Sequence, residues 1–426
     1  MPTNSRGTNR ARLDFTSVLF YILLVGFGFI NIYSASTGAD PEFSLSLKEV
    51  YVRQLIWMFG SFLLIVLVAF SNPNFFEFSA YVIYGITTAL LIAVLLVGRE
   101  VSGAKSWFGF GGIGIQPSEF AKFGTALAVA KYLGTYGVKF KGWKNISITL
   151  ALILVPMSIV LLQNDTGSAL VFLSFALVLY REGLPGYFLI VAVWATILSL
   201  ATIIFSAQGW KEYWILTGIA SIALLFFLLF RKNRQAWWLI TTIAIGSWVL
   251  VKVAHWGYYN ILQTHQRDRI EVILQLKKDD KGVGFNLIQS KTAIGAGRAF
   301  GRGFLQGTQT KMGFVPEQHT DFIFCTVGEE WGVAGITVFF FIYFGLLYRL
   351  VILSERQTTR FGRVLGYSVT SILFFHIAIN IGMTIGLVPI IGIPLPFVSF
   401  GGSSLWAFTL LLFTFLKLDE RRLSYV

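Results

Sequence analysis

The sequence contains few charged residues and almost no cysteine. Only 13% of its 426 residues are charged, whereas a soluble domain carries about 25%. Because 55% are hydrophobic and the mean hydropathy is +0.70, the polar residues are too few to cover a water-soluble globule. The single cysteine, Cys325, excludes an intramolecular disulfide and a zinc site built on cysteines. Its place in an apolar run indicates a buried, inert thiol.

The sequence also lacks motifs for binding nucleotides or metals. The glycine run from Gly295 to Gly301 resembles a dinucleotide fingerprint, but it has one residue too many and no Walker Lys-Ser/Thr follows it. His255 and His265, two of the four histidines, are ten residues apart, which is no metal-ligand spacing. The net charge of +13 comes from Lys and Arg spread over short loops between apolar segments, so we reject a nucleic-acid-binding surface.

Long apolar segments dominate the chain instead. A transmembrane helix needs about 20 mostly apolar residues, so we expect an all-α, polytopic membrane bundle of about twelve helices. The first segment is too long for a signal-peptide core and has no clean cleavage site after it, so we expect a retained signal anchor. The expected spans are 15–35, 52–70, 78–97, 118–134, 146–162, 167–181, 185–205, 213–230, 237–256, 322–348, 365–385 and 403–417.

Lys and Arg residues are distributed unevenly between these spans. Cytoplasmic loops of membrane proteins carry an excess of both, and placing the N-terminus inside assigns 17 of them to cytoplasmic segments and five to the short outer loops. We therefore expect both termini in the cytoplasm. The inner set is Arg6, Arg10, Arg12, Lys139, Lys141, Lys144, Arg181, Arg231, Lys232, Arg234, Arg349, Arg356, Arg360, Arg363, Lys417, Arg421 and Arg422; the outer set is Lys48, Arg53, Arg99, Lys105 and Lys211.

Three segments on the expected outer side are unusual. The segment 98–117 is rich in glycine, and 386–402 contains three prolines. The segment 257–321 is long and polar but carries apolar residues throughout. Loops of this length in compact proteins are usually functional or disordered. Because of its apolar residues we expect this one to pack against the bundle.

Charged residues inside apolar segments are candidates for function, because an unpaired charge in hydrocarbon is costly. Glu119 and Lys122 are three residues apart, so they lie on one helix face and can pair. One interpretation is a structural ion pair. The other is a polar cavity in which Lys122 meets an anionic substrate.

Asp321 comes at the expected start of the helix over 322–348. The positive end of that helix and the nearby His319 favour its ionised form, while partial burial opposes it. It is either an N-terminal cap or a reactive carboxylate. Glu329 and Glu330 follow about two turns later and are expected to face the bundle interior. A packing or pairing role is as consistent with that position as a catalytic role.

A basic cluster lies in the long outer segment. It is either a solvated stretch or a site for phosphate or lipid headgroups. Its members are Arg267, Arg269, Lys277, Lys278 and Lys281.

Several sequence blocks follow one another along nearly the whole chain: Gly103-Ala-Lys-Ser-Trp107, Gln116-Pro-Ser-Glu119-Phe-Ala-Lys122, Gln163-Asn-Asp165-Thr-Gly167, Gln266-Arg267, Gly284 to Ser290, Pro316 to Phe324, and Gly386 to Ser404. Together these blocks resemble the SEDS (shape, elongation, division, sporulation) family of peptidoglycan glycosyltransferases. Two departures stand out: Ser106 occupies a position where the family usually has Arg, and Asn164 one where it has Pro.

The resemblance implies polymerisation of lipid II into glycan strands at the outer face of the bacterial cytoplasmic membrane, and we favour a role in elongation over division. It implies a class B penicillin-binding protein as partner, alongside other elongation-complex proteins. We expect no tightly bound cofactor, although a divalent cation, Mg or Mn, can be required. The acceptor hydroxyl needs a base and the leaving pyrophosphate needs positive charge. We assign the base to Asp321 and substrate binding to Trp107, Gln116, Glu119, Lys122, Arg267, Arg269 and His319.

The family usually has ten spans, so the chain is expected to be one membrane domain over 1–426 with the outer loop at 257–321 and a two-helix insertion over 206–256.

Two other functions remain open. A lipid II flippase would need a polar path to both membrane faces, whereas the motif residues concentrate at the outer ends of helices. A non-catalytic scaffold would tolerate the loss of Asp321.

Overall fold

The computed structural model describes residues 13–37, 44, 46–101, 103–110, 113–135, 142–231, 233–260, 264, 267, 270–271, 283–315 and 317–422. The chain divides into two compact units, one formed by 1–183 with 289–426 and the other by 184–288. The described residues are mostly helical, which confirms the expected polytopic helical architecture. Eight of their helices are long and apolar enough to cross a membrane.

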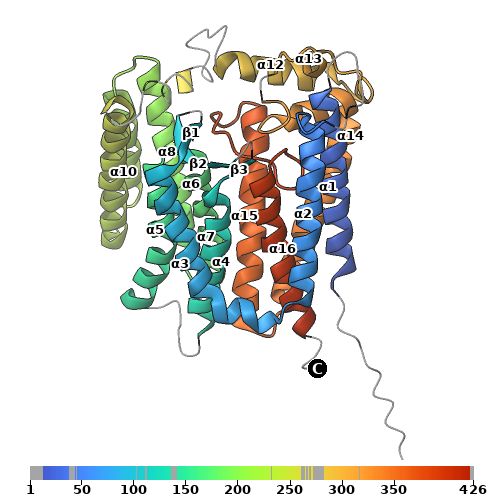
Figure 1. Cartoon of the computed structure of the whole chain (residues 1–426). Helices are drawn as coiled ribbons and strands as arrows, with labels where there is room; N and C mark the ends of the chain where they lie inside the picture. Colours follow the sequence, from blue (N-terminus) through green and yellow to red (C-terminus); the bar gives the residue numbers. More distant parts are fainter. Residues whose placement is uncertain are drawn as a thin grey trace, which may run out of the picture. The chain divides into compact units, whose positions relative to one another are not determined.

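The first unit contains most of the helices (Figure 1). Before the second unit these are α1 (Phe15–Ser36), α2 (Val50–Phe70), α3 (Pro73–Val97), α4 (Pro117–Gly134), α5 (Trp143–Leu162), α6 (Thr166–Val171), a short 3-10 helix (Phe172–Ser174) and α7 (Phe175–Arg181). After it come α13 (Thr308–Lys311), α14 (Ile323–Glu355), α15 (Arg360–Thr384) and α16 (Gly402–Arg422). The unit boundary at 288 falls within α12 (Val283–Ala296).

Local sequence signals explain where these helices begin. The side chains of Asp14, Asn72 and Thr359 accept hydrogen bonds from backbone amides in the first turns of α1, α3 and α15. Such caps satisfy amide groups that have no partner within the helix. Pro73 and Pro117 stand in the first turns of α3 and α4, where a missing amide hydrogen costs nothing.

Helices α4 and α15 contact each other and form the centre of this unit. Most residues of α4 are buried, many of them alanines, and α3 and α5 pack against it. At Gly124 an added Cβ would come within 2.3 Å of the Thr87 side chain on α3. Small residues allow such close approach between membrane helices. Because protein surrounds α4, it needs no lipid-facing apolar surface.

A small antiparallel sheet follows α3, in a segment that we expected only to be a glycine-rich loop. It is made of β1 (Arg99–Val101), β2 (Ala104–Phe110) and β3 (Ile113–Ile115), in the order β1-β2-β3. Arg99 pairs with Trp107, and Phe108 pairs with Ile115. The amide of Lys105 donates to the carbonyl of Gln163 at 3.0 Å, which ties β2 to the turn before α6.

Helix α14 is broken at Gly332, which has φ +62 and ψ −163. The glycine-containing turn after α12 lies across this break: the amides of Arg302 and Gly303 donate to the carbonyls of Glu329 and Glu330 at 2.9 and 3.0 Å. An added Cβ at Gly301 would lie 2.0 Å from the Glu330 carbonyl oxygen. The glycine run that resembled a nucleotide motif therefore allows two backbone segments to meet.

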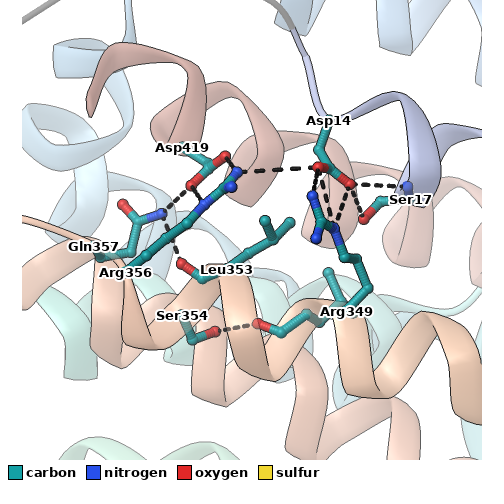
Figure 2. A network of polar contacts seen from close by, with 9 residues as sticks. Asp14, Ser17, Arg349, Leu353, Ser354, Arg356, Gln357 and Asp419 are labelled. Carbon is teal, nitrogen blue, oxygen red and sulfur yellow. Dashed lines mark hydrogen bonds and ion pairs between the residues drawn. The ribbon is translucent and has the colours of Figure 1, made fainter. Parts of the chain in front are cut away.

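The first and the last described helices of the first unit begin and end, respectively, at the same end of the bundle. The start of α1 and the end of α16 lie at one end of the bundle, and β1 to β3 with α13 lie at the other (Figure 1). Figure 2 shows a charge network near the start of α1 and the end of α14, which consists of Asp14, Arg349, Arg356, Gln357 and Asp419. Arg349 donates to both oxygens of Asp14, and Arg356 donates to Asp419. These contacts connect α1, α14 and α16.

The second unit contains α8 (Gly186–Ala207), α9 (Tyr213–Leu229) and α10 (Arg234–Asn260). Helix α10 packs against both others, and Trp194 Nε1 donates to Ser247 Oγ at 3.1 Å. Helix α9 has no buried residue. Each of the expected membrane segments, in both units, overlaps a helical stretch. That 206–256 is an insertion, and that 257–321 lies outside the cytoplasm, stay predictions.

Candidate functional site

The segment that contains Asp321 is held in place through hydrogen bonds to its backbone carbonyls. The carbonyl oxygen of His319 accepts from the Phe400 amide at 2.8 Å. The next carbonyl, of Thr320, accepts from Ser399 Oγ at 2.6 Å, and that of Asp321 accepts from Asn380 Nδ2 at 2.9 Å. Three consecutive carbonyls are thus bonded to α15 and to the segment before α16, which fixes the path of the chain here.

Asp321 itself is partly exposed and precedes helix α14. The helix begins at Ile323 and its cap position is Phe322. The alternative that Asp321 is the helix cap is therefore wrong in this structure, because the chain turns once more before the helix starts. An added Cβ at Gly392 would lie 3.1 Å from Asp321 Oδ2, so the carboxylate lies against the turn at Gly392.

Glu119 and Lys122 form an ion pair in the centre of the bundle. Lys122 Nζ lies 2.8 Å from Glu119 Oε1 and 2.7 Å from His376 Nε2, and all three side chains are buried. The ring of Phe408 lies beneath the ammonium group. These contacts fit the interpretation of a structural ion pair, while the assignment of Glu119 and Lys122 to substrate binding stays a prediction. His376 Nδ1 lies 3.2 Å from the carbonyl oxygen of Pro394, in the segment opposite Asp321.

Gln116 holds a second buried carboxylate. Its Nε2 donates to Asp165 Oδ2 at 2.8 Å, and Asp165 Oδ1 accepts from the amide of Ser168 at the start of α6. Asn164, beside it, has φ +61, a conformation that proline cannot adopt. The departure of this sequence from the proline of the family pattern thus agrees with the local backbone.

Trp107 lies on β2 with its ring against Gly114, where an added Cβ would come within 2.9 Å of it. The preceding residue, Ser106, is buried. A buried serine offers no charge to a pyrophosphate, but Arg99 stands opposite Trp107 in the sheet and is exposed.

His319 and Arg53 both contact the ring of Phe400. The His319 ring packs edge-on against Phe400, and the Arg53 guanidinium lies over the same ring, 5.4 Å from its centre. Burial lowers the pKa of His319; Glu317 opposes this shift and Arg53 adds to it. A neutral imidazole is therefore favoured at neutral pH. Sequence reasoning counted Arg53 only as a loop charge.

The basic cluster is described only in part. Arg267 belongs to the second unit, where its guanidinium lies over the Tyr258 ring at 5.8 Å from the centre. Arg269, Lys277, Lys278 and Lys281 lie outside the described residues. The assignment of Arg267 and Arg269 to substrate binding stays a prediction.

The side chains of Glu329 and Cys325 make contacts that indicate structural roles. Both carboxylate oxygens of Glu329 accept hydrogen bonds from the first turn of α13, including the amides of Thr308, Gln309 and Thr310 at 2.7, 2.8 and 3.0 Å. Glu329 therefore caps a helix distant in sequence. Cys325 is fully buried and lies 2.8 Å from Ser290 Oγ, as an inert thiol should be. Within the described ranges no group of three or more His, Cys, Asp or Glu side chains is arranged to hold a metal.

Sequence reasoning missed His376, Asn380 and Ser399. A signal for the first two exists in the sequence: both are polar residues inside an apolar segment, four residues apart, the same kind of signal that singled out Glu119 and Lys122. Ser399 belongs to a block that matches the family, but nothing in its local sequence indicates its partner.

Comparisons with known proteins agree over almost the entire chain. The family model described as cell cycle protein (FtsW, RodA, SpoVE) matches residues 15–217 and 215–422. The peptidoglycan glycosyltransferase RodA of Treponema pallidum is 31% identical, with 96% of this chain and 98% of that protein covered. The peptidoglycan glycosyltransferase MrdB of Escherichia coli is 32% identical, with 95% and 92% covered.

Solved structures show the same fold. A chain from a peptidoglycan synthase complex that coordinates polymerization and crosslinking has a TM-score of 0.69 and 27% identity, with 96% of this chain and 98% of that chain covered. The crystal structure of the rod shape determining protein RodA of Thermus thermophilus has a TM-score of 0.60 and 25% identity, with 96% and 97% covered.

Proposed function

The chain belongs to the FtsW/RodA/SpoVE family of cell cycle proteins, and we propose that this integral membrane peptidoglycan glycosyltransferase polymerises lipid II, with Asp321 as general base. The observation that carries the proposal is the position of Asp321. Its backbone is fixed through three consecutive carbonyls, while its side chain remains partly exposed just before α14. A base must combine a fixed position with access to substrate.

The proposed reaction needs one base and no acid. The carboxylate of Asp321 takes the proton of the acceptor hydroxyl as its oxygen attacks the anomeric carbon of the donor sugar. The bond from that carbon to undecaprenyl pyrophosphate breaks, and the pyrophosphate leaves without a proton. Because we assign no carboxylate as nucleophile, we propose direct displacement with inversion.

Positive charge must stabilise the leaving pyrophosphate. We propose that Arg53 and Arg99 contribute to it, since Arg53 lies near His319 and Arg99 stands beside Trp107, while Ser106 offers no charge. Arg267 and Arg269 extend this set as proposed from the sequence. We expect activity to respond to Mg²⁺ or Mn²⁺, which can neutralise the same phosphates. If the protein that carries both Arg267→Gln and Arg269→Gln kept full activity in excess chelator, the assignments of these two arginines and of the divalent cation would be contradicted.

The proposed setting is the cytoplasmic membrane, with the Asp321 end of the first unit outside and both termini inside, as the Lys and Arg distribution indicates. A class B penicillin-binding protein is the proposed partner. The rod shape determining protein of Thermus thermophilus, to which the chain is similar, supports the proposed role in elongation, and the peptidoglycan synthase complex supports the partnership.

The test is polymerisation of purified lipid II by the Asp321→Asn protein. A positioned base contributes roughly 10²–10⁴-fold in rate, so this variant should fold, bind lipid II and make almost no glycan. Glu317→Gln is the matched control, because Glu317 is an exposed carboxylate four residues away and should be dispensable. Near-normal polymerisation by folded Asp321→Asn protein would refute the mechanism, and loss of activity in Glu317→Gln would redirect it.

A further inference from the structure

Two of the three contacts that hold the Asp321 segment come from side chains, those of Asn380 and Ser399, to which the sequence analysis assigned no role. Asn380 on α15 is fully buried and its Nδ2 donates both to Asp321 O at 2.9 Å and to Ile393 O at 2.7 Å. An amide nitrogen has two hydrogens, so both bonds can exist at once. They join the backbone of Asp321 to the turn against which its carboxylate lies.

Ser399 makes a similar connection from the other side. Its hydroxyl donates to Thr320 O at 2.6 Å and accepts from the Leu395 amide at 2.8 Å, and the side chain is 4% exposed. Asn380 and Ser399 therefore both link residues 320–321 to residues 393–395. This second segment includes the Pro394 carbonyl that contacts His376.

We propose that Asn380 and Ser399 are positioning residues, which set the direction of the Asp321 carboxylate by holding the carbonyls of Asp321 and Thr320. This inference rests on the proposed role of Asp321 as base. Neither side chain acts on the substrate. Each fixes the backbone from which the base projects, and a misplacement of about 1 Å can cost roughly 10²-fold in rate.

The first test is the pair Ser399→Ala and Ser399→Thr in the full-length chain. Ser399→Ala removes the donor to Thr320, and we expect kcat for lipid II polymerisation to fall about 10–100-fold, with KM changed less than about threefold. Ser399→Thr keeps a hydroxyl and should recover most of kcat. Ser368→Ala is the control: this buried serine on α15 donates to Val364 within its own helix at 2.8 Å, and kcat should be unchanged.

Asn380→Ala gives a second, independent measurement, and we expect the same selective loss of kcat. In the Asp321→Asn background, Ser399→Ala should reduce the residual rate by less than about twofold, because no base remains to be positioned. Unchanged kcat per folded molecule in both Ser399→Ala and Asn380→Ala would overturn the inference, as would a full additional loss in that background. Activity of Asp321→Asn itself would instead refute the proposed function, so the two failures are distinguishable.

Discussion

At the level of single residues, Lys122 shows how the protein accommodates a charge in the middle of an apolar bundle. Its ammonium group contacts Glu119, His376 and the face of Phe408. These contacts lie in the buried interior of the bundle, which favours the structural interpretation of Lys122, while its assignment to substrate binding stays a prediction. Because the pair is buried, each partner is important for stability.

Lys122→Met should therefore lower stability strongly. Removing one partner of a buried pair leaves the other charge uncompensated, at a cost of about 3–5 kcal/mol. Thermal unfolding of the purified protein measures the effect, and the double variant Glu119→Gln with Lys122→Met should recover part of the loss.

The matched control for that substitution is Lys131→Met on the same helix. Lys131 lies 3.5 Å from Glu77 and both are about one third exposed, so its loss should cost less than about 1 kcal/mol. An unchanged melting temperature in Lys122→Met with lost polymerisation would contradict the structural role and restore the interpretation that Lys122 binds substrate.

At the level of elements, close backbone contacts decide how the glycine turn and α14 meet. Gly301 has φ +78, and its missing Cβ is what allows the Glu330 carbonyl to approach. The turn does not need this contact in order to form. The contact exists because α14 is interrupted at Gly332, and the turn supplies hydrogen bonds to α14 carbonyls that have no partner within the helix.

Gly301→Ala should destabilise the protein. The left-handed backbone alone costs an alanine about 1–2 kcal/mol, and the clash with the Glu330 carbonyl adds to it. Gly295→Ala is the matched control, because an added Cβ there meets nothing within 4 Å and alanine favours the helix. Comparison of the two melting temperatures checks this, and equal values would show that the turn shifts without cost.

The charge network near the start of α1 and the end of α14 should make stability depend on acid pH. Burial raises the pKa of Asp14, but hydrogen bonds from Arg349 and Ser17 outweigh this and bring the pKa below 3.8. The charged carboxylate thus contributes fully above about pH 4, and its contribution disappears as pH falls through the lower pKa of the folded state.

We expect Asp14→Ala to cost about 1–3 kcal/mol, since it removes both the α1 cap and the bonds from Arg349. Asp14→Asn keeps the capping ability and removes the charge, so it should lose less at neutral pH and show a smaller fall in melting temperature between pH 5 and pH 3. An identical acid response in Asp14→Asn and the parent protein would assign that response to other groups.

At the level of the whole molecule, the arrangement of the first unit allows its orientation to be tested. The start of α1 and the end of α16 lie at the same end, and the sheet and α13 lie at the opposite end (Figure 1). Cys325 is buried, so the parent protein should give little background with a thiol reagent, and single cysteines can be introduced at exposed positions at either end.

Met312→Cys, just after α13, should react with an impermeant thiol reagent in intact spheroplasts. Lys144→Cys, at the start of α5, should react only after lysis. Both parent residues are exposed, so accessibility within the fold does not separate them. The expectation follows from the Lys and Arg distribution, and the reverse labelling pattern would invert the proposed topology.

The sequence by itself determined the membrane architecture. A helix in an apolar environment satisfies its own backbone, so length and apolarity locate each span. The span over α4 was also predicted, although α4 is less apolar than its neighbouring helices. Its burial on all sides explains this lower apolarity. The sheet at 99–115 was missed, because short strands are defined by pairing rather than by apolar runs. The motif blocks located Asp321, His319, Gln116 and Trp107 without showing their contacts.

Only the tertiary structure decided what surrounds these residues. His376 meets Lys122 across 254 positions of sequence, and Ser399 holds Thr320 across 79. No periodicity encodes such pairs, because they depend on how helices pack and where the chain turns between them. The same packing buries Lys122, places Asp321 before the helix rather than at its cap, and brings Asn380 and Ser399 to the carbonyls of Asp321 and Thr320, contacts that spacing along the chain could not reveal.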